Sequence, residues 1–391
     1  MNEGGETTRA AGKMAGGATP EGTQRYAARL SSAGRTVAGH FRAHAELRAS
    51  SIGIGTYLGK SDDATDASYT LAIEAALAAG ANVIDLAVSY RSGRSERAAG
   101  AALATRVRAG TIARDEVIVA TKGGYIAADQ RVGIDPARAI EDIYIRPGIL
   151  RADEIAGGNH AIAPRFLANQ ISRSLASTGL DTLDVYFLHN PEAQLADVER
   201  DEFLRRMRAA FAHLESECAA GRIQRYGIST WHGLRISPED RGYVSLAETV
   251  AIAREVGGAN HHFGVVQLPL NLLMLEALAL GNQAGEWDET AETLEAVTPI
   301  EAAERFGLTV WASASLFQAR LARRVPPEFA RAIGGLRTDA QRALQFVRSA
   351  PGVTVALVGC AQAAHAAENL EVALTPPIPP KQFLSRFFGN G

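Results

Sequence analysis

Four residues with acid–base side chains stand at or just after the ends of apolar segments. Asp85, Lys122 and His189 each close an apolar run, and Tyr90 lies in the turn that follows Asp85. A buried strand rarely ends on a bare charge unless another group pairs with it or uses it. A phenol has a pKa of about 10, and a nearby ammonium lowers that value by stabilising the phenolate. These residue types predict a site that moves a proton to or from a substrate oxygen.

Each of the four residues has a distinct role in this prediction. Lys122 supplies the ammonium beside Tyr90, and Asp85 holds Lys122 by an ion pair. His189 donates a hydrogen bond to a substrate oxygen. Together these groups would protonate the alkoxide that forms when hydride reaches a carbonyl, or remove that proton in reverse. Taken singly, each residue is explained as well by packing or surface exposure, so the prediction rests on all four.

Alternating strand and helix patterns are expected to position these residues. Eight apolar segments indicate strands, at residues 52–57, 83–87, 116–121, 183–188, 223–229, 264–268, 308–312 and 353–358. Helical patterns separate them, at residues 67–79, 95–109, 164–178, 201–220, 246–256, 290–306, 338–349 and 362–373. This alternation predicts an α/β fold, a single (β/α)8 TIM barrel with an N-terminal extension and long loop insertions. The alternative is a doubly wound sheet, but Gly53-Ile-Gly55 lacks the third glycine and the immediate helix of that fold.

The organisation outside the barrel follows from composition. Residues 1–24 are rich in small and polar groups and are expected to be disordered or to form a loosely held arm. Residues 25–50 are expected to form an N-terminal extension packed on the barrel. The barrel itself is expected over residues 51–375, with irregular insertions near 123–163, 271–289 and 317–336. Residues 376–391 are expected to form a Pro-rich C-terminal tail.

Bulk properties exclude several classes of function. The chain has 391 residues, 47% of them hydrophobic, and a formal net charge of −3, which does not suit a nucleic-acid partner. It has no apolar run of membrane-spanning length, so no membrane partner is expected. The distant cysteines, Cys218 and Cys360, indicate a reducing, cytoplasmic location. The pair His261-His262 lacks a third ligand, so no metal site is expected. The oligomeric state is not predicted.

The residues Asp85, Tyr90, Lys122 and His189, each in its strand-end context, resemble the tetrad of the aldo-keto reductases. The resemblance covers about residues 51–375, and the long insertions resemble those of larger, poorly characterised members. It implies an NAD(P)(H)-dependent oxidoreductase that interconverts a carbonyl and an alcohol by direct hydride transfer. In that reaction Tyr90 would be the general acid/base, and the partner would be a small-molecule carbonyl or alcohol.

The resemblance also implies a set of cofactor contacts at the strand ends and in the loops after them. Thr230 replaces a common Asn, Ser313 falls where an aromatic ring often stacks, and residues 360–365 lack an Arg that holds a 2′-phosphate. Arg320, Arg323 and Arg324 are candidates to replace that Arg, so NADP(H) is the expected cofactor and NAD(H) stays open. The predicted cofactor contacts are Gly55, Thr56, Tyr57, Ser229, Thr230, Gln267, Ser313, Leu316, Gln318, Arg320, Gly359, Gln362, Glu368 and Asn369.

Three residues are candidates for substrate contact: Arg91, Asn190 and Trp231. Arg91 either points a charge into the substrate mouth or forms a loop salt bridge. His160 is expected to be a loop residue, with lining of the site as the alternative. Two other functions stay open: a nucleotide-sensing regulatory subunit with little turnover, and a redox-neutral epimerase or dehydratase that uses a retained cofactor.

Overall fold

The barrel predicted from the alternating pattern is present. The computed structural model describes residues 13–126, 136–286 and 295–389. Parallel strands close on one another in the order β11-β12-β3-β4-β5-β6-β7-β8. Their bounds are β3 Ile52–Gly55, β4 Val83–Asp85, β5 Ile118–Gly123, β6 Leu183–His189, β7 Ile223–Ser229, β8 Phe263–Pro269, β11 Thr309–Ser313 and β12 Val353–Gly359.

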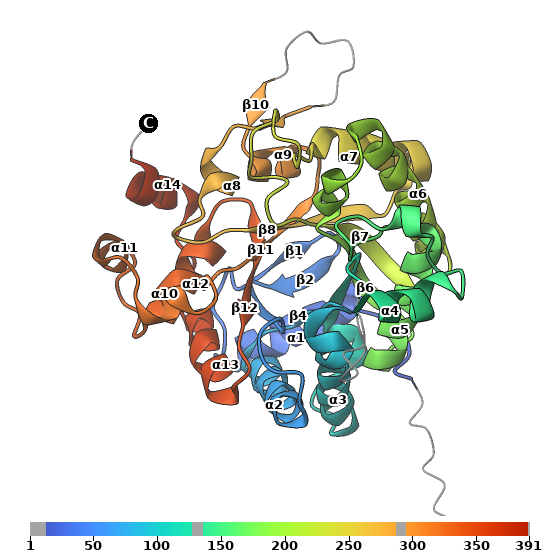
Figure 1. Ribbon diagram of the computed structural model, residues 1–391. Helices are drawn as coiled ribbons and strands as arrows, with labels where there is room; N and C mark the ends of the chain where they lie inside the picture. The colour runs from blue at the N-terminus through green and yellow to red at the C-terminus, as the bar shows by residue number, and fades with distance from the viewer. Residues whose placement is uncertain (1–12, 127–135, 287–294, 390–391) are drawn as a thin grey trace, which may run out of the picture.

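Helices surround these strands as an outer ring (Figure 1). The ring includes α2 Asp63–Ala79, α3 Arg94–Arg108, α5 Pro164–Thr178, α6 Arg200–Ala219, α7 Leu246–Gly257, α9 Pro299–Arg305, α12 Asp339–Ser349 and α13 Ala363–Leu370. Local signals set their ends: α5 begins with a proline at its first position and ends at Gly179, whose φ of 69° suits glycine. The helices bury apolar faces against the outside of the barrel, as the right-handed β-α-β pattern requires.

An antiparallel hairpin fills the barrel end opposite the strand carboxyl ends. It consists of β1 Phe41–His44 and β2 Leu47–Ser50. Leu47 and Ala49 join a buried cluster with barrel-lining residues of β4, β5, β6, β8, β11 and β12. The His44 and Trp311 rings lie 5.5 Å apart. The hairpin, at the centre of Figure 1, therefore completes the core of the barrel.

A helix begins within the range predicted to form the N-terminal arm. Residues 1–12 lie outside the described residues, but the helix α1, Pro20–Ser32, begins inside the predicted arm of residues 1–24. Thr19 caps it by accepting a hydrogen bond from the Gly22 N–H. The Ala18 N–H donates to Asp184 in β6 over 2.6 Å. A buried carboxylate in the barrel thus fixes a segment whose composition suggested disorder.

Three other segments differ from their predicted form. The helix expected at residues 290–306 begins at Pro299, because Thr298 caps it and accepts a bond from the Glu301 N–H; residues 290–294 lie outside the described part. Strand β5 runs two residues further than predicted and includes Lys122. The Pro-rich tail contains the helix α14, Pro380–Phe388, which buries Phe383.

The long insertions contain short elements of their own. The first holds α4 Pro136–Ile140, a π-helical turn η3 Glu141–Ile145 and a 3₁₀ turn η4 Ala152–Glu154. The second holds α8 Glu276–Ala279 and β9 Gln283–Ala284, which pairs with β10 Ala296–Val297 beyond the insertion. The third holds α10 Arg320–Arg323 and α11 Pro327–Ala332. Across the described ranges, no helix is both long and apolar enough to cross a bilayer.

Candidate active site

A buried ion pair joins the ends of β4 and β5. The Lys122 ammonium donates hydrogen bonds to both carboxylate oxygens of Asp85, over 2.7 and 2.6 Å, and to the Leu86 carbonyl oxygen over 2.9 Å. The two strands are neighbours in a parallel barrel, so their carboxyl ends lie at the same face. Lys122 is fully buried, and burial lowers its pKa while the Asp85 charge raises it. The predicted pairing is thus present in the structure.

Tyr90 lies directly above this ion pair. It begins the 3₁₀ turn η1, Tyr90–Gly93, in which Arg91 and Ser92 adopt left-handed φ angles of 49° and 56°. The Lys122 nitrogen lies 4.8 Å from the centre of the Tyr90 ring. The His189 ring meets the Tyr90 ring edge-to-face at 5.7 Å. All four residues predicted to carry the chemistry therefore meet at one face of the barrel.

The protonation of these groups differs from the sequence-based expectation in one respect. Burial, and next the Asp85 carboxylate, raise the pKa of Tyr90 well above its usual range, whereas the sequence suggested that Lys122 lowers it. The reason is that the Lys122 ammonium directs its hydrogens at Asp85 and Leu86. Burial, with the Lys122 charge, lowers the pKa of His189 well below its usual range. Tyr90 is therefore a protonated phenol and His189 a neutral imidazole at neutral pH.

Three predicted cofactor residues, Gln267, Ser229 and Thr56, extend the same buried network. Gln267, in β8, donates from Nε2 to the Asp85 carboxylate over 2.9 Å. Ser229, at the end of β7, donates its hydroxyl hydrogen to Gln267 Oε1 over 2.9 Å. Thr56 donates to the Asp85 backbone oxygen over 3.2 Å. Next to Ser229, the buried Thr230 hydroxyl has no hydrogen-bond partner among the described residues.

The other predicted cofactor residues lie along the same face, after β3, β11 and β12. Gly55 and Gly359 are partners in register at the ends of β3 and β12, and Gly359 is exposed. Gln362 precedes α13 without capping it through its side chain. Ser313 ends β11, and Leu316, Gln318 and Arg320 follow in a segment with left-handed φ at Ala314, Phe317, Gln318 and Ala319. Glu368 and Asn369 lie on α13, where Asn369 is buried beside Cys360.

The structure does not place the Arg91 side chain in the substrate mouth. Its guanidinium donates to Asp66 on α2 over 2.8 Å and to the Ser95 hydroxyl over 3.3 Å. It also lies over the Tyr69 ring, 4.5 Å from the ring centre. The salt-bridge alternative is therefore the one that the structure supports. Because Arg91 is 6% exposed, its charge is held against α2.

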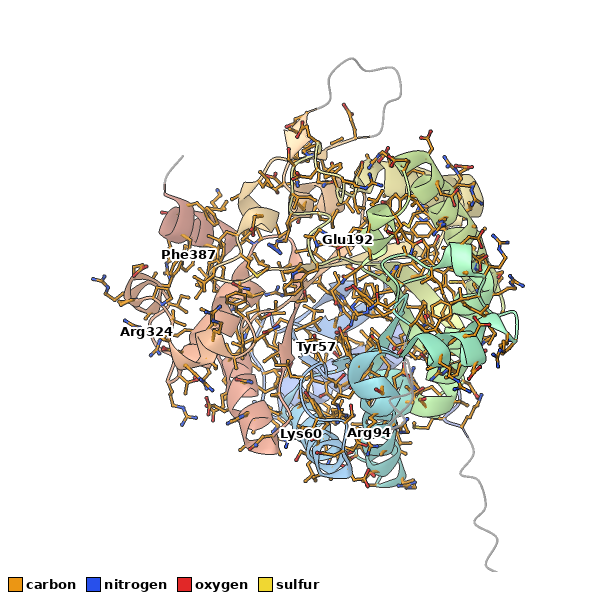
Figure 2. All side chains as sticks on the ribbon, in the orientation of Figure 1. Tyr57, Lys60, Arg94, Glu192, Arg324 and Phe387 are labelled. Carbon is orange, nitrogen blue, oxygen red and sulfur yellow. The ribbon has the colours of Figure 1, made fainter. Side chains whose placement is uncertain are left out.

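The mouth above the four residues is aromatic. Tyr57 is 58% exposed and meets the Tyr90 ring at 5.1 Å, and Trp231 is 42% exposed. Asn190, whose φ is 49°, donates from its side chain to the Tyr125 hydroxyl over 3.0 Å. In Figure 2, Tyr57 lies near the middle of the view, over the barrel, whereas Arg324 lies at its outer edge.

Sequence analysis missed several residues around His189. The Tyr125 ring lies edge-to-face with the His189 ring at 5.0 Å, and the sequence signal for it is its position two residues after the end of β5. The buried Glu192 accepts hydrogen bonds from the Trp231, His232 and Gly233 N–H groups. Glu192 thereby holds the loop after β7, and no local sequence signal indicated this.

A family comparison agrees with this geometry. Residues 51–237 match the Aldo/keto reductase family. The matched segment runs from β3 through β7 and includes Asp85, Tyr90, Lys122 and His189. The resemblance to the aldo-keto reductases is thereby confirmed for the part of the chain that carries the four residues. None of the curated proteins matches the sequence.

Solved aldo-keto reductase structures share the fold. A complex of an aldo/keto reductase from Klebsiella pneumoniae with NADP and acetate is 21% identical, with a TM-score of 0.55, over 91% of this chain and 96% of that one. A glycerol dehydrogenase from Gluconobacter oxydans is 18% identical, with a TM-score of 0.57, over 91% and 98%. The holo form of an aldo-keto reductase from Bacillus halodurans is 17% identical, with a TM-score of 0.56, over 90% and 97%. At these identities the likeness concerns the barrel.

Proposed function

We propose that this protein is an NAD(P)(H)-dependent oxidoreductase that interconverts a carbonyl and an alcohol. The observation that carries the proposal is the buried Asp85–Lys122 ion pair beneath the Tyr90 ring, with His189 beside it. The family match supports the oxidoreductase class. We also propose a cytoplasmic location, because Cys218 and Cys360 are both free thiols.

Tyr90 is the proton donor in the proposed reduction. Its raised pKa keeps the phenol protonated at neutral pH, so the proton is available when charge develops on the carbonyl oxygen. The Lys122 ammonium then stabilises the phenolate that remains, and Asp85 holds Lys122 in place. The neutral His189 ring donates a hydrogen bond to the same substrate oxygen. When bound, a nicotinamide cofactor would supply or accept the hydride.

The residues present fit such a cofactor. Ser229, Thr230 and Gln267 gather hydroxyl and amide groups at the ends of β7 and β8, and the unpartnered Thr230 hydroxyl is available to a carboxamide. At the other side of the face, a Cβ atom at Gly359 would meet only the Gly55 carbonyl oxygen, at 3.9 Å, and Gly359 is exposed, so the backbone at these two strand ends is open to a ligand. The first turn of α13, which Gln362 does not cap, offers N–H groups to a phosphate.

NADP(H) is the cofactor that we propose. The Klebsiella pneumoniae structure contains NADP. In this chain Arg320, Arg323 and Arg324 are exposed in the segment after β11, where they can meet a 2′-phosphate. We expect fluorescence titration to give tighter binding of NADPH than of NADH, and Arg320→Ala to reduce that difference. The control is Arg331→Ala, an exposed arginine on α11, which should keep it.

The test of the function is turnover of a carbonyl and alcohol panel with the preferred cofactor. The proposal predicts equimolar consumption of NAD(P)H and carbonyl. Tight cofactor binding without turnover across the panel would contradict it and support a regulatory subunit. Product formation without net change in NAD(P)H would support an epimerase or dehydratase instead.

A further inference from the structure

His160 is a buried imidazole in direct contact with the backbone of His189. It has no exposed surface, and its Nε2 atom lies 2.8 Å from the His189 carbonyl oxygen. The Tyr125 ring lies edge-to-face with both imidazoles, at 5.0 Å from each. The residue that sequence analysis assigned to a loop therefore lies immediately behind the proposed active site.

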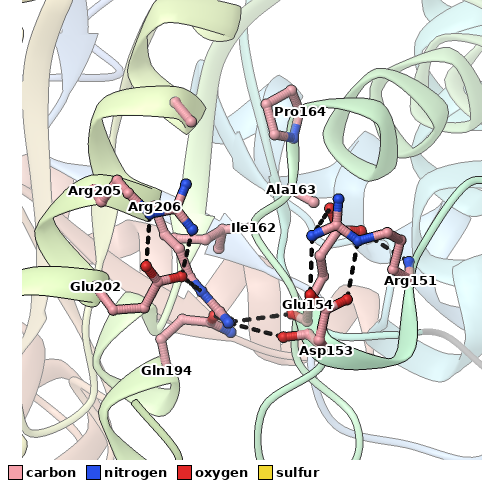
Figure 3. A pocket seen from close by; sticks show the side chains of 11 residues that line it. Arg151, Asp153, Glu154, Ile162, Ala163, Pro164, Gln194, Glu202, Arg205 and Arg206 are labelled. Atoms are coloured by element: carbon pink, nitrogen blue, oxygen red, sulfur yellow. Dashed lines mark hydrogen bonds and ion pairs between the residues drawn. The ribbon is translucent and has the colours of Figure 1, made fainter. Parts of the chain in front are cut away.

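A chain of hydrogen bonds leads from His160 to the surface. Gln194, also fully buried, directs its Nε2 atom at His160 Nδ1 over 2.8 Å and donates to the His160 carbonyl oxygen over 3.1 Å. Its Oε1 atom accepts a hydrogen bond from Arg206 Nη1 over 2.6 Å. Figure 3 shows this contact in the wall of a cavity of about 160 Å³ between α6 and the segment before α5.

The donor and acceptor types of Arg206, Gln194 and His160 permit only one arrangement of hydrogens along this series of hydrogen bonds. An arginine only donates, so the Gln194 atom that faces Arg206 is its oxygen. The Gln194 atom that faces His160 is then the NH₂ group, which makes Nδ1 an acceptor and places the ring proton on Nε2. A carbonyl oxygen only accepts, so Nε2–H donates to His189. Burial lowers the pKa of His160 to about 4, which keeps this single proton at neutral pH.

We propose that His160 is a positioning residue for His189, and that Arg206 acting through Gln194 fixes its tautomer. The inference rests on the proposed function of His189 as the group that orients the substrate oxygen. Because Asn190, the next residue, is in a left-handed conformation, the His189 carbonyl lies where the strand turns sharply into the loop. A donor at that carbonyl therefore fixes the peptide group that directly follows the Cα atom carrying the His189 ring.

The packing around His160 is adapted to this contact. Gly124 has a φ of +138°, and a Cβ atom there would lie 2.8 Å from His160 Nε2 and 3.0 Å from the His189 carbonyl oxygen. The Gly124 N–H is itself held by the buried Gln170 side chain over 2.8 Å. The absence of a side chain at residue 124 is what permits the two histidines to approach.

The decisive variant is Gln194→Glu, which keeps the size of the side chain and its pairing with Arg206. A carboxylate cannot donate, so the single ring proton of His160 moves to Nδ1 and the Nε2 lone pair then faces the His189 carbonyl oxygen. We expect kcat at neutral pH to fall by about tenfold or more, as small displacements of reacting groups do, with the cofactor Kd unchanged. Nitrogen-15 NMR of histidine-labelled protein reports the tautomer directly.

The pH profile gives a readout that general loss of structure would not. In the Gln194→Glu variant the new carboxylate beside Nδ1 raises the pKa of His160 above that of the wild-type ring. Below that pKa, His160 carries two protons and donates from both nitrogens, so kcat should recover as pH falls. The wild-type protein should show no such limb near neutral pH. The other titratable groups that face His160 are Tyr125 and His189, with Arg206 beyond Gln194 and its partner Glu202.

Neighbouring arginines on α6 provide a matched pair of controls. Arg206→Met removes the donor that orients the Gln194 amide, and should lower kcat and shift the His189 ring resonances. Arg205→Met removes an exposed arginine that pairs only with Glu202 in this cavity, and should do neither.

A wild-type His160 protonated at Nδ1, or equal kcat in Gln194→Glu and wild type, would overturn the inference. If no carbonyl is turned over, the function fails, but the tautomer and the His189 resonances still decide this inference.

Discussion

At the residue scale, the Lys122 ammonium acts mainly through Asp85. Its hydrogens point at two carboxylate oxygens and at the Leu86 carbonyl, and Gln267 supports the same carboxylate. The Tyr90 phenol therefore lies next to a neutralised pair in a buried site, which raises its pKa. This arrangement suits proton donation in carbonyl reduction better than proton removal from an alcohol.

Lys122→Met tests the role of the buried ammonium. The substitution leaves Asp85 buried without its cation, so we expect the free energy of unfolding to fall by about 3–5 kcal/mol. We also expect kcat to fall by at least about 10²-fold, because the Asp85 carboxylate, left without its cation, then opposes the negative charge that develops on the Tyr90 oxygen. Urea denaturation and steady-state kinetics measure the two effects.

The control for this substitution is Lys60→Met, which alters an exposed lysine in the loop before α2. It should change neither quantity. Wild-type kcat in a folded Lys122→Met variant would contradict the assigned role.

The types of the four residues at the strand ends were readable from the sequence, but their surroundings were not. The sequence could not show that Arg91 turns away toward Asp66 and Tyr69, because both partners lie on α2, more than twenty residues earlier. Nor could it show the burial that raises the Tyr90 pKa. Side-chain direction and burial depend on tertiary packing, which residue types alone do not specify.

At the element scale, Asp184 in β6 connects three segments of the chain. Its carboxylate accepts hydrogen bonds from the Ala18 N–H and the Val119 N–H, each over 2.6 Å, and from Arg114 over 2.8 Å. Most strand and helix positions follow from apolar periodicity and caps. The position of Ala18, just before the α1 cap, does not, because a carboxylate 166 residues away in the sequence holds it.

Asp184→Asn tests this connection. An amide can accept at one atom only, so one backbone N–H would face an NH₂ group and Arg114 would lose its counter-charge. We expect the free energy of unfolding to fall by about 3 kcal/mol, with faster hydrogen exchange of residues 14–20. Asp181→Asn, at an exposed carboxylate just before β6, is the control, and an equal loss in both variants would argue against the connection.

At the scale of the whole molecule, several histidines are buried in the fold as neutral rings. Burial lowers the pKa of His40 and of His44 to about 3, and that of His160 to about 4. In the unfolded chain these groups titrate near 6.5. The unfolded state therefore binds more protons than the folded state between about pH 6.5 and pH 3, and the free energy of unfolding falls as pH falls through this window.

We expect each of His40 and His44 to account for a loss of about 2 kcal/mol between pH 7 and pH 5. His44→Gln should make the pH dependence of unfolding shallower by that amount, whatever it does to stability at pH 7. His365→Gln, at an exposed position on α13, should leave the slope unchanged. A slope that is identical in wild type and His44→Gln would show that His44 is not buried as a neutral ring.

The most direct test of the account as a whole is the single-turnover rate of the Tyr90→Phe variant with bound NADPH. The ring and its contacts with Lys122 and His189 remain, but the proton donor is lost. We predict that cofactor affinity is unchanged and that the rate of carbonyl reduction falls by at least about 10²-fold. Tyr243→Phe, which removes a buried hydroxyl bonded to the Asn282 carbonyl oxygen, should keep the wild-type rate. A wild-type rate in Tyr90→Phe would contradict the proposed mechanism.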